Sequence, residues 1–416
     1  MIETGPHRRL GRRAGWWLGV AAYIVVFAVQ AAATRAVFTQ AHPGANDLYP
    51  RWAGGCAWLL QGDNPYSPAT TEAIQKGIFG RPALPGEDQA AFAYPIYVVL
   101  FTWPLCLTND FSIVQAVWMT ALIHLLVVAA VLARRLSGWS PSARLWPWVL
   151  AWAVLVYPNS RAVLLGQLAV VVAALILGSL YALKLRRDVV AGIVLALTTI
   201  KPQMILLFVP WVVVWAAAQG RWRVVVAFAA SLAAFAAIPL IWLPSWPADF
   251  LRQLNAYTSY TELGSVTWIL TSYYAHWPPA VEIAVSALFL AWLAWEGYRS
   301  RSMDLPSMLW AASLTLVITH FVSPRTATTH FAPLMLPLFM GFALMARRWG
   351  SRATPAIASI LLLVLMGTWV LFLMTVQGNQ ESALTYLPIP VFLVVLLPMM
   401  KGAWLRAQRP AVVDSL

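Results

Sequence analysis

The chain has 416 residues, of which 61% are hydrophobic and only 10% are charged. A soluble domain is about 45–50% apolar and about 25% charged, so this composition excludes a water-soluble globule and predicts an all-α polytopic membrane protein. The net charge of +13 would indicate nucleic acid in a soluble protein, but basic residues of a membrane protein collect on its cytoplasmic side. We therefore expect no nucleic-acid partner.

The first apolar run covers residues 16–33 and follows four arginines. The apolar core of a signal peptide is about 7–15 residues long, and this run is longer. We predict a retained transmembrane helix, although the small residues 31–33 leave a cleavage site as the alternative.

A long hydrophilic loop follows at residues 37–112. Asp47 would lie just beyond the first span, where a carboxylate can act as a general base towards a hydroxyl group. The alternative is that Asp47 caps a short helix on the membrane surface, which the apolar face of residues 50–61 predicts. Residues 92–97, with Tyr94, bring aromatic side chains back to the interface, as the aromatic belts of membrane proteins also do.

The two cysteines of the chain, Cys56 and Cys106, both fall in this first loop. They could form a disulfide, but two cysteines in a membrane protein are more often unpaired, and the sequence leaves both alternatives open.

Further apolar runs bring the prediction to about twelve transmembrane helices, several of them near the lower length limit for spanning a bilayer. These runs lie at 113–133, 145–157, 168–183, 189–200, 204–218, 224–243, 281–295, 308–322, 331–345, 356–376 and 387–400. Residues 94–106 are also apolar, but they are short and contain Pro95 and Pro104, so they could span, re-enter or lie at the interface.

The positions of the basic residues decide the orientation. If residues 94–106 do not span, 20 of the 28 Lys and Arg residues lie on the cytoplasmic side together with both termini. The loops 37–112 and 244–278 are then extracytoplasmic, as are most of the acids. Because function concentrates in loops and helix ends held by a rigid bundle, we expect the chemistry on this outer face.

Two polar residues occur at unexpected places in the spans. Lys201 follows Asp188 by about 13 residues, which puts it about 20 Å into an apolar core about 30 Å thick. A cation at that depth usually lines a polar cavity with a partner, and a lipid phosphate is a natural one; snorkelling to the surface is the alternative. Gln167 opens another span, where it could bind a sugar or join two helices.

His320, Arg325 and His330 lie around the outer turn between two late spans. Three potential donors on the side of Asp47 and Lys201 predict a phosphate-binding group, with a hydrated turn as the alternative. Two histidines without patterned carboxylates are a poor metal signature. His124, alone within a span, is predicted to be a hydrogen-bonded core residue.

The remaining signals are weak. In the second large loop, Asp249 and Arg252 have the spacing of a helix-surface ion pair and predict no more than that. The common signatures of ATP-driven transport, metalloprotease chemistry and thiol chemistry are not present in the sequence.

The order of several short segments resembles the GT-C class of integral-membrane glycosyltransferases, and most of all glycosyltransferase family 87, with its polyprenyl-phosphate-mannose-dependent mannosyltransferases. The matching segments cover about residues 40–215. They are Asp47 with Tyr49, Gln61-Gly62-Asp63-Asn64-Pro65-Tyr66, Phe92-Ala93-Tyr94-Pro95, Gly166-Gln167, and Ala191-Gly192 followed by Lys201-Pro202.

The resemblance implies a hexosyltransferase in the plasma (inner) membrane that moves a sugar, mannose by preference, from a polyprenyl-phosphate donor to a hydroxyl of a lipid or glycan acceptor. It implies Asp47 as the general base and Lys201 on the donor phosphate, helped by His320, Arg325 or His330. Tyr49, Tyr94 and Gln167 would line the sugar or acceptor pocket. Asn46-Asp47 lacks the paired acids of metal-binding GT-C enzymes, so we expect no metal and no cofactor.

Two other classes of function remain open on the sequence. A flippase or transporter of lipid-linked saccharides would need a charged path through both leaflets. A structural membrane protein would tolerate the loss of Lys201.

Overall fold

The computed structural model describes residues 6–84, 86–257, 264–300, 304–378 and 380–408. Within these residues the chain forms helices and no strand, apart from one isolated bridge between Gln377 and Gln380. The predicted all-α class is therefore confirmed for the part of the chain that the structure describes. Residues 258–263 of the predicted second loop, and Arg301 and Arg409 among the predicted cytoplasmic cations, lie outside it.

The α-helices of the first half carry the first loop and the centre of the bundle. They are α1 (Pro6–Thr34), α2 (Tyr49–Cys56), α3 (Pro68–Phe79), α4 (Val99–Thr102), α5 (Phe111–Ser137), α6 (Trp146–Leu155), α7 (Tyr157–Leu164), α8 (Ala169–Lys184), α9 (Asp188–Leu197) and α10 (Pro202–Ile205). The second half continues with α11 (Phe208–Ala218), α12 (Trp222–Ala237), α13 (Trp246–Tyr257), α14 (Val266–Trp268), α15 (Pro279–Ser300), α16 (Leu305–Val322), α17 (Met335–Trp349), α18 (Ala353–Thr375) and α19 (Pro388–Gln408).

Shorter helical turns connect these helices. The 3₁₀ turns are η3 (Ile96–Val98), η4 (Trp103–Leu107), η5 (Thr198–Ile200), η6 (Ile238–Ile241), η8 (Thr328–His330), η9 (Ala332–Leu334), η10 (Gly350–Arg352) and η11 (Ala383–Tyr386); the π-helical turns are η1 (Arg35–Thr39), η2 (Ala57–Gln61) and η7 (Ile269–Tyr274).

Every predicted apolar run contains helix, but the number of spans differs from the expected twelve. Among the residues that the structure describes, seven helical segments are long and apolar enough to cross a membrane, or eight if the bent pair α7 and α8 is one span. The helices α6, α9 and α11 are only 10–17 residues long with their flanking turns, whereas a straight span needs about 20 residues. The count of about twelve therefore remains a prediction. The segment 96–107 is also in this short class and is too short for a straight span.

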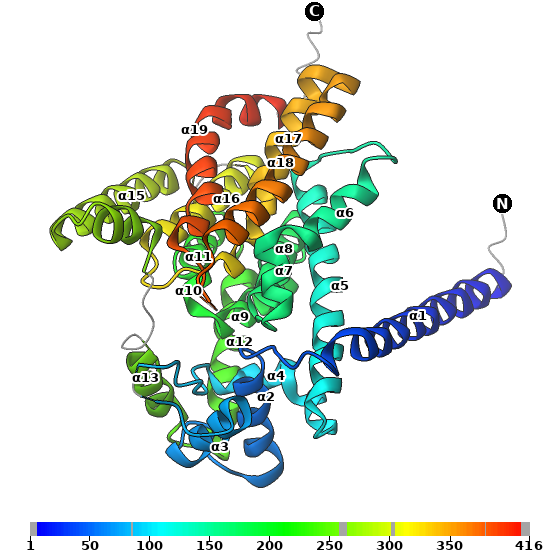
Figure 1. Ribbon diagram of the computed structural model, residues 1–416. Helices are drawn as coiled ribbons and strands as arrows, with labels where there is room; N and C mark the ends of the chain where they lie inside the picture. Colours follow the sequence, from blue (N-terminus) through cyan, green and yellow to red (C-terminus); the bar gives the residue numbers. More distant parts are fainter. Residues whose placement is uncertain (1–5, 85, 258–263, 301–303, 379, 409–416) are drawn as a thin grey trace, which may run out of the picture.

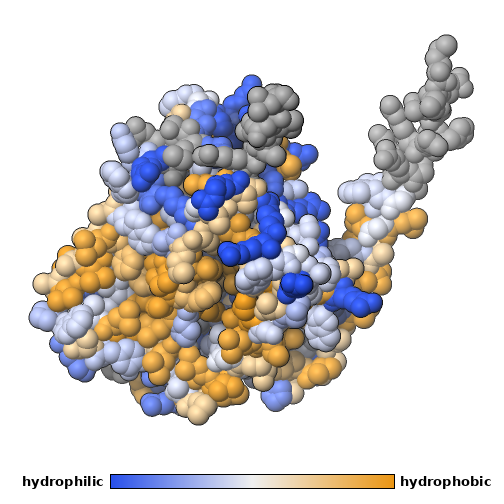
Figure 2. All heavy atoms as spheres, turned by 90° about the horizontal axis from the view of Figure 1, so that it is seen from above, coloured by the Kyte–Doolittle hydropathy of each residue, from blue (hydrophilic) through white to orange (hydrophobic). Residues whose placement is uncertain are grey.

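The helices pack around α5, α8 and α16, while α1 projects from the side of the bundle (Figure 1). Large apolar side chains on α12, α15 and α18 face outward, among them Val226, Leu288 and Leu363. Figure 2 shows broad hydrophobic areas on one face of the molecule, with hydrophilic residues gathered in one part of it. Exposed apolar surface of this extent indicates contact with lipid.

The two predicted extracytoplasmic loops lie at the same end of the bundle, where α2, α3 and α13 are neighbours (Figure 1). Asn64 of the first loop donates from Nδ2 to Asp249 Oδ2 of the second, over 2.8 Å. Asp249 also pairs with Arg252 at 3.2 Å, as the sequence predicts. Its buried carboxylate does more than form that surface pair, however, because it joins the two loops.

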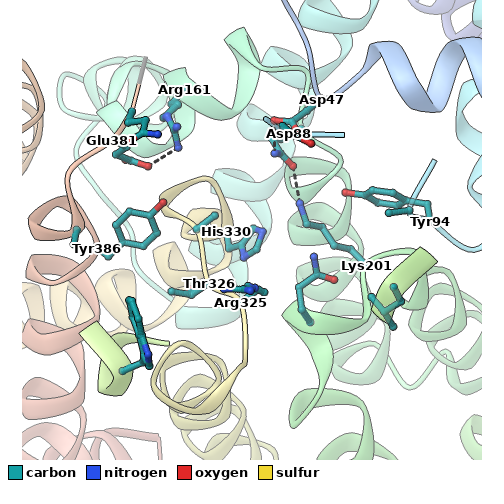
Figure 3. Close-up of a pocket in the computed structure, with 18 of the residues that line it drawn as sticks. Asp47, Asp88, Tyr94, Arg161, Lys201, Arg325, Thr326, His330, Glu381 and Tyr386 are labelled. Atoms are coloured by element: carbon teal, nitrogen blue, oxygen red, sulfur yellow. Dashed lines mark hydrogen bonds and ion pairs between the residues drawn. The ribbon is translucent and has the colours of Figure 1, made fainter. Parts of the chain in front are cut away.

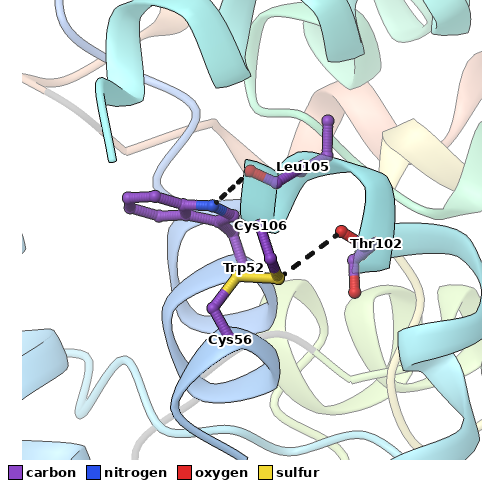
Figure 4. Close-up of a disulfide and its surroundings, with 5 residues drawn as sticks. All are labelled: Trp52, Cys56, Thr102, Leu105 and Cys106. Atoms are coloured by element: carbon purple, nitrogen blue, oxygen red, sulfur yellow. Dashed lines mark hydrogen bonds between the residues drawn. A yellow bond between two sulfur atoms is a disulfide. The ribbon is translucent and has the colours of Figure 1, made fainter. Parts of the chain in front are cut away.

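A disulfide joins Cys56 at the end of α2 to Cys106 in η4 (Figure 4). Of the two alternatives that the sequence left open, the structure therefore shows the bridge and not the commoner unpaired state. The structure brings the two segments together through packing that spacing does not reveal, because Trp52, one turn before Cys56, buries its ring and donates from Nε1 to the Leu105 carbonyl at 3.0 Å. The bridge fixes the short apolar segment 96–107 against the first-loop helix.

Replacing both cysteines by serine should lower the thermal unfolding midpoint of the purified protein by several degrees. In the chain-entropy account, a cross-link that closes a loop of this length stabilises by up to about 4 kcal/mol. A reducing agent should shift the wild-type midpoint in the same direction and leave the double variant unchanged. Two thiols that react in the unreduced, denatured wild type would contradict the bridge.

Candidate active site

A polar cavity of about 530 Å³ opens between the first loop and the broken helices of the bundle. Figure 3 shows its labelled side chains converging from several elements far apart in the sequence. Six of the residues singled out by the sequence line this one cavity: Asp47, Tyr94, Gln167, Lys201, Arg325 and His330.

The centre of the site is a chain of hydrogen bonds through Gln167. Its amide Nε2 donates to Asp47 Oδ2 at 2.7 Å, and its Oε1 accepts from Lys201 Nζ at 2.6 Å. Since a carboxylate only accepts and an ammonium only donates, the two neighbours dictate which way the amide points. These two hydrogen bonds hold the carboxylate and the ammonium group at opposite ends of one neutral amide, so that both charges remain in the cavity without direct contact.

The packing of Gly166 explains how Asp47 reaches Gln167. Gly166 has φ +69° at the 119° bend between α7 and α8. A Cβ there would lie 2.7 Å from the Leu48 Cβ, so the backbone turn that carries Asp47 can approach only a glycine. Trp118 of α5 fixes the bend by donating from Nε1 to the Gly166 carbonyl at 3.0 Å.

Lys201 lies at a break in the bundle rather than within a helix. It follows η5 and precedes Pro202, the first residue of α10, with extended-type backbone angles (φ −132°, ψ 78°). Proline favours the first position of a helix and is disfavoured further along. The side chain is only 3% exposed, and it points to Gln167. The prediction of a buried cation in a polar cavity is therefore confirmed, and snorkelling to the surface is excluded.

Arg51, one turn after Asp47, covers the other side of the same carboxylate. Its guanidinium lies 3.5 Å from Asp47 Oδ1 and 4.3 Å from the centre of the Tyr94 ring. Burial favours the neutral phenol of Tyr94, but Arg51 and Lys201 together outweigh it and lower the pKa of this side chain. Tyr97 on the same segment bonds to Thr199 Oγ1 at 3.0 Å, which anchors the first loop on the turn before Lys201.

The late loop contributes to the cavity differently from the prediction. His330 lines it, and burial, followed by the positive charge of Lys201, lowers the pKa of its imidazole well below the usual value. The ring is therefore neutral near pH 7 and can take part as a hydrogen-bonding group, not as a cation.

Two predicted residues are not among those that line the cavity. His320 is buried and bonds through Nδ1 to Thr326 Oγ1 at 2.7 Å, so it supports the loop that carries Arg325. Tyr49 packs its ring on Phe111 at 4.8 Å between centroids; it follows Asp47 by two residues and so points to another face of the turn. His124 bonds to Tyr23 and Gln30 of α1, which confirms that it is hydrogen-bonded, but it is only partly buried and lies where α1 contacts α5 rather than in the core.

The sequence did not single out the other side of the cavity, which Arg161 of α7 and Glu381, just before η11, line together. Arg161 Nη1 and Glu381 Oε2 are 2.5 Å apart. The sequence offers one weak signal for each residue. Arg161 is a charged residue in an interrupted apolar stretch, and Glu381 is an acid in a predicted outer loop. Nothing in the sequence connects two residues 220 positions apart.

The charges of the lining residues favour an anionic ligand. Four cations face three carboxylates, namely Arg51, Arg161, Lys201 and Arg325 against Asp47, Asp88 and Glu381. Within the described ranges, no group of three His, Cys, Asp or Glu residues has the arrangement of a metal site. The cavity thus combines a carboxylate that can accept a proton with cations that can hold a phosphate.

Comparison with protein-family models gives a match to one described as glycosyltransferase family 87 over residues 92–324, which is more than half of the chain. Neither the curated proteins nor the solved structures gave a match. The matched range includes Tyr94, Arg161, Gln167 and Lys201 but neither Asp47 nor Glu381.

Proposed function

This chain belongs to glycosyltransferase family 87, and from that premise we propose that it transfers a hexose, mannose by preference, from a polyprenyl-phosphate donor to a hydroxyl group of a lipid or glycan acceptor. We place the reaction on the extracytoplasmic side of the plasma membrane, with both termini in the cytoplasm. The observation that carries the proposal is the Asp47–Gln167–Lys201 chain in the polar cavity.

The reaction needs one base and one group that stabilises the leaving phosphate. Asp47 takes the proton of the acceptor hydroxyl as its oxygen attacks the anomeric carbon. The bond from that carbon to the phosphate oxygen breaks, and polyprenyl phosphate leaves as a monoester whose developing charge Lys201 stabilises. A single displacement inverts the anomeric configuration. Tyr94 and Gln167 line the sugar pocket.

The disulfide supports the proposed orientation. Disulfides form and persist in oxidising environments outside the cytoplasm, and the bridge from Cys56 to Cys106 lies in the first loop, next to the helix that follows Asp47.

The test is transfer by the purified protein in liposomes that contain a polyprenyl-phosphate-hexose labelled in the sugar. We expect the release of one polyprenyl phosphate for each hexose transferred. The anomeric configuration of the product should be opposite to that of the donor. Nucleotide sugars alone should give no product, since no polyprenyl phosphate carries the hexose. Transfer from a nucleotide sugar, or retention of configuration, would refute the proposal.

The same assay tests the expected metal independence. Because Lys201 and the arginines of the cavity carry the positive charge that a metal supplies elsewhere, excess EDTA should leave the initial rate within about twofold. Added Mg²⁺ or Mn²⁺ should not raise the rate of EDTA-treated protein. A rate that EDTA abolishes and one of these ions restores would contradict this expectation.

A further inference from the structure

Arg161 and Glu381 form an ion pair on one wall of the cavity, and the proposed mechanism assigns no role to it. The Glu381 side chain is only 2% exposed. Its Oε2 accepts from Arg161 Nη1, and its Oε1 accepts from the Tyr157 hydroxyl at 2.8 Å and the Thr328 hydroxyl at 2.7 Å. Three donors from α7 and η8 therefore fix this carboxylate in one position.

Glu381 in turn fixes Arg161. The guanidinium reaches both Glu381 and Thr328 through the single nitrogen Nη1, and the Tyr386 hydroxyl of η11 is a further hydrogen-bonding neighbour. The side chain is 24% exposed and lines the cavity (Figure 3). A buried ion pair gives little net stability, because desolvation of the two charges offsets their attraction. Its more evident effect here is to hold a planar cationic fork at the edge of a polar space.

The position of Arg161 indicates what such a fork would bind. A second cavity of about 420 Å³ is lined almost entirely by apolar side chains, mainly of α6, α7, α17, α18 and α19. Residues close together in the chain line different cavities. Asn159 and Phe331 line the apolar cavity, whereas Arg161 and His330 line the polar one. Arg161 thus lies at a boundary between polar and apolar space.

A phosphate joined to a hydrocarbon chain fits this boundary, because its charged group and its chain need the two kinds of space side by side. The guanidinium fork matches phosphate oxygens in pairs, which an ammonium cannot do. Of the two substrates in the proposed reaction, the donor is the one whose class requires a phosphate on a hydrocarbon chain.

We propose that Arg161 binds the phosphate of the polyprenyl-phosphate donor at the boundary of the two cavities, and that Glu381 is the positioning residue that holds its guanidinium there. The inference rests on the proposed function. It adds to Lys201 a second cation on the donor phosphate, from the opposite wall of the cavity.

The test compares Arg161→Gln, Arg161→Lys and Glu381→Gln in the liposome assay, with donor and acceptor varied separately. We expect the KM for the donor to rise about 10- to 100-fold in Arg161→Gln, as for the loss of charge-assisted hydrogen bonds, with the acceptor KM unchanged. Arg161→Lys should recover part of the loss. Glu381→Gln keeps the arginine but loosens it, so it should raise the donor KM by a smaller factor. The matched control is Arg252→Gln, which removes an exposed cation outside the cavity.

A second measurement is independent of sugar transfer. Polyprenyl phosphate alone should bind the wild type and Arg252→Gln with equal affinity and Arg161→Gln about 10- to 100-fold more weakly, among proteins with matched unfolding midpoints. A change in the acceptor KM alone would overturn the inference. So would an equal rise in the KM for both substrates that is accompanied by a lower unfolding midpoint. If the wild type binds polyprenyl phosphate through Arg161 but transfers no sugar, the proposed function fails and the binding site stands.

Discussion

Replacing Asp47 by asparagine should lower kcat for hexose transfer by about 10²- to 10⁴-fold, the usual contribution of a general base. The amide has nearly the same shape and its oxygen can still accept from Gln167 Nε2, which lies 2.7 Å from the carboxylate. The KM for the donor should therefore change little, but no general base remains at this position to take the proton of the acceptor hydroxyl. Initial rates at saturating donor and acceptor concentrations measure this effect.

Two further acids make the Asp47 experiment decisive. Asp110→Asn changes another acid of the first loop, which pairs with Arg35 and is not among the residues that line the cavity, so its kcat should stay within about twofold of the wild type. Asp88 does line the cavity. Full transfer by Asp47→Asn together with a large loss in Asp88→Asn would assign the base to Asp88.

The sequence predicted one side of this cavity because each of its residues breaks a local rule. Lys201 is a cation too deep for a span, and Gln167 is an amide at the start of an apolar run. Asp47 is an acid in the loop just beyond the first predicted span. Such exceptions can be recognised in a single stretch of chain, and hydropathy places them on the same side of a membrane. The structure joins them by two hydrogen bonds.

The opposite side of the cavity could not be predicted in this way. Arg161 and Glu381 meet only because the bend at Gly166 and the segment after α18 come together, and long-range packing has no local signature. The same reason explains the disulfide, since Cys56 and Cys106 are neighbours through the docking of Trp52. The number of spans is likewise not fixed by hydropathy alone, because broken helices such as η5 and α10 look in the hydropathy pattern like ordinary short spans.

Replacing Lys201 by methionine should lower kcat by about 10²- to 10³-fold, comparable with the loss of one group that stabilises transition-state charge. Methionine keeps much of the length of the side chain, so the packing around the 3%-exposed lysine changes little. The leaving phosphate, however, loses the cation that stabilises its developing negative charge. Initial rates at saturating substrate, with the unfolding midpoint measured in parallel, separate this effect from a loss of folded protein.

A second donor distinguishes the two roles open to Lys201, which could act on the phosphate directly or only orient Asp47 through Gln167. A hexosyl donor whose leaving group has a lower pKa needs less help to depart, so it should restore much of the rate of Lys201→Met and little of that of Asp47→Asn. Gln167→Leu breaks the connection between lysine and carboxylate while leaving both charges in place. If Gln167→Leu loses as much activity as Lys201→Met, and the better leaving group rescues neither, then Lys201 acts by holding Asp47, and the phosphate must rely on other cations of the cavity.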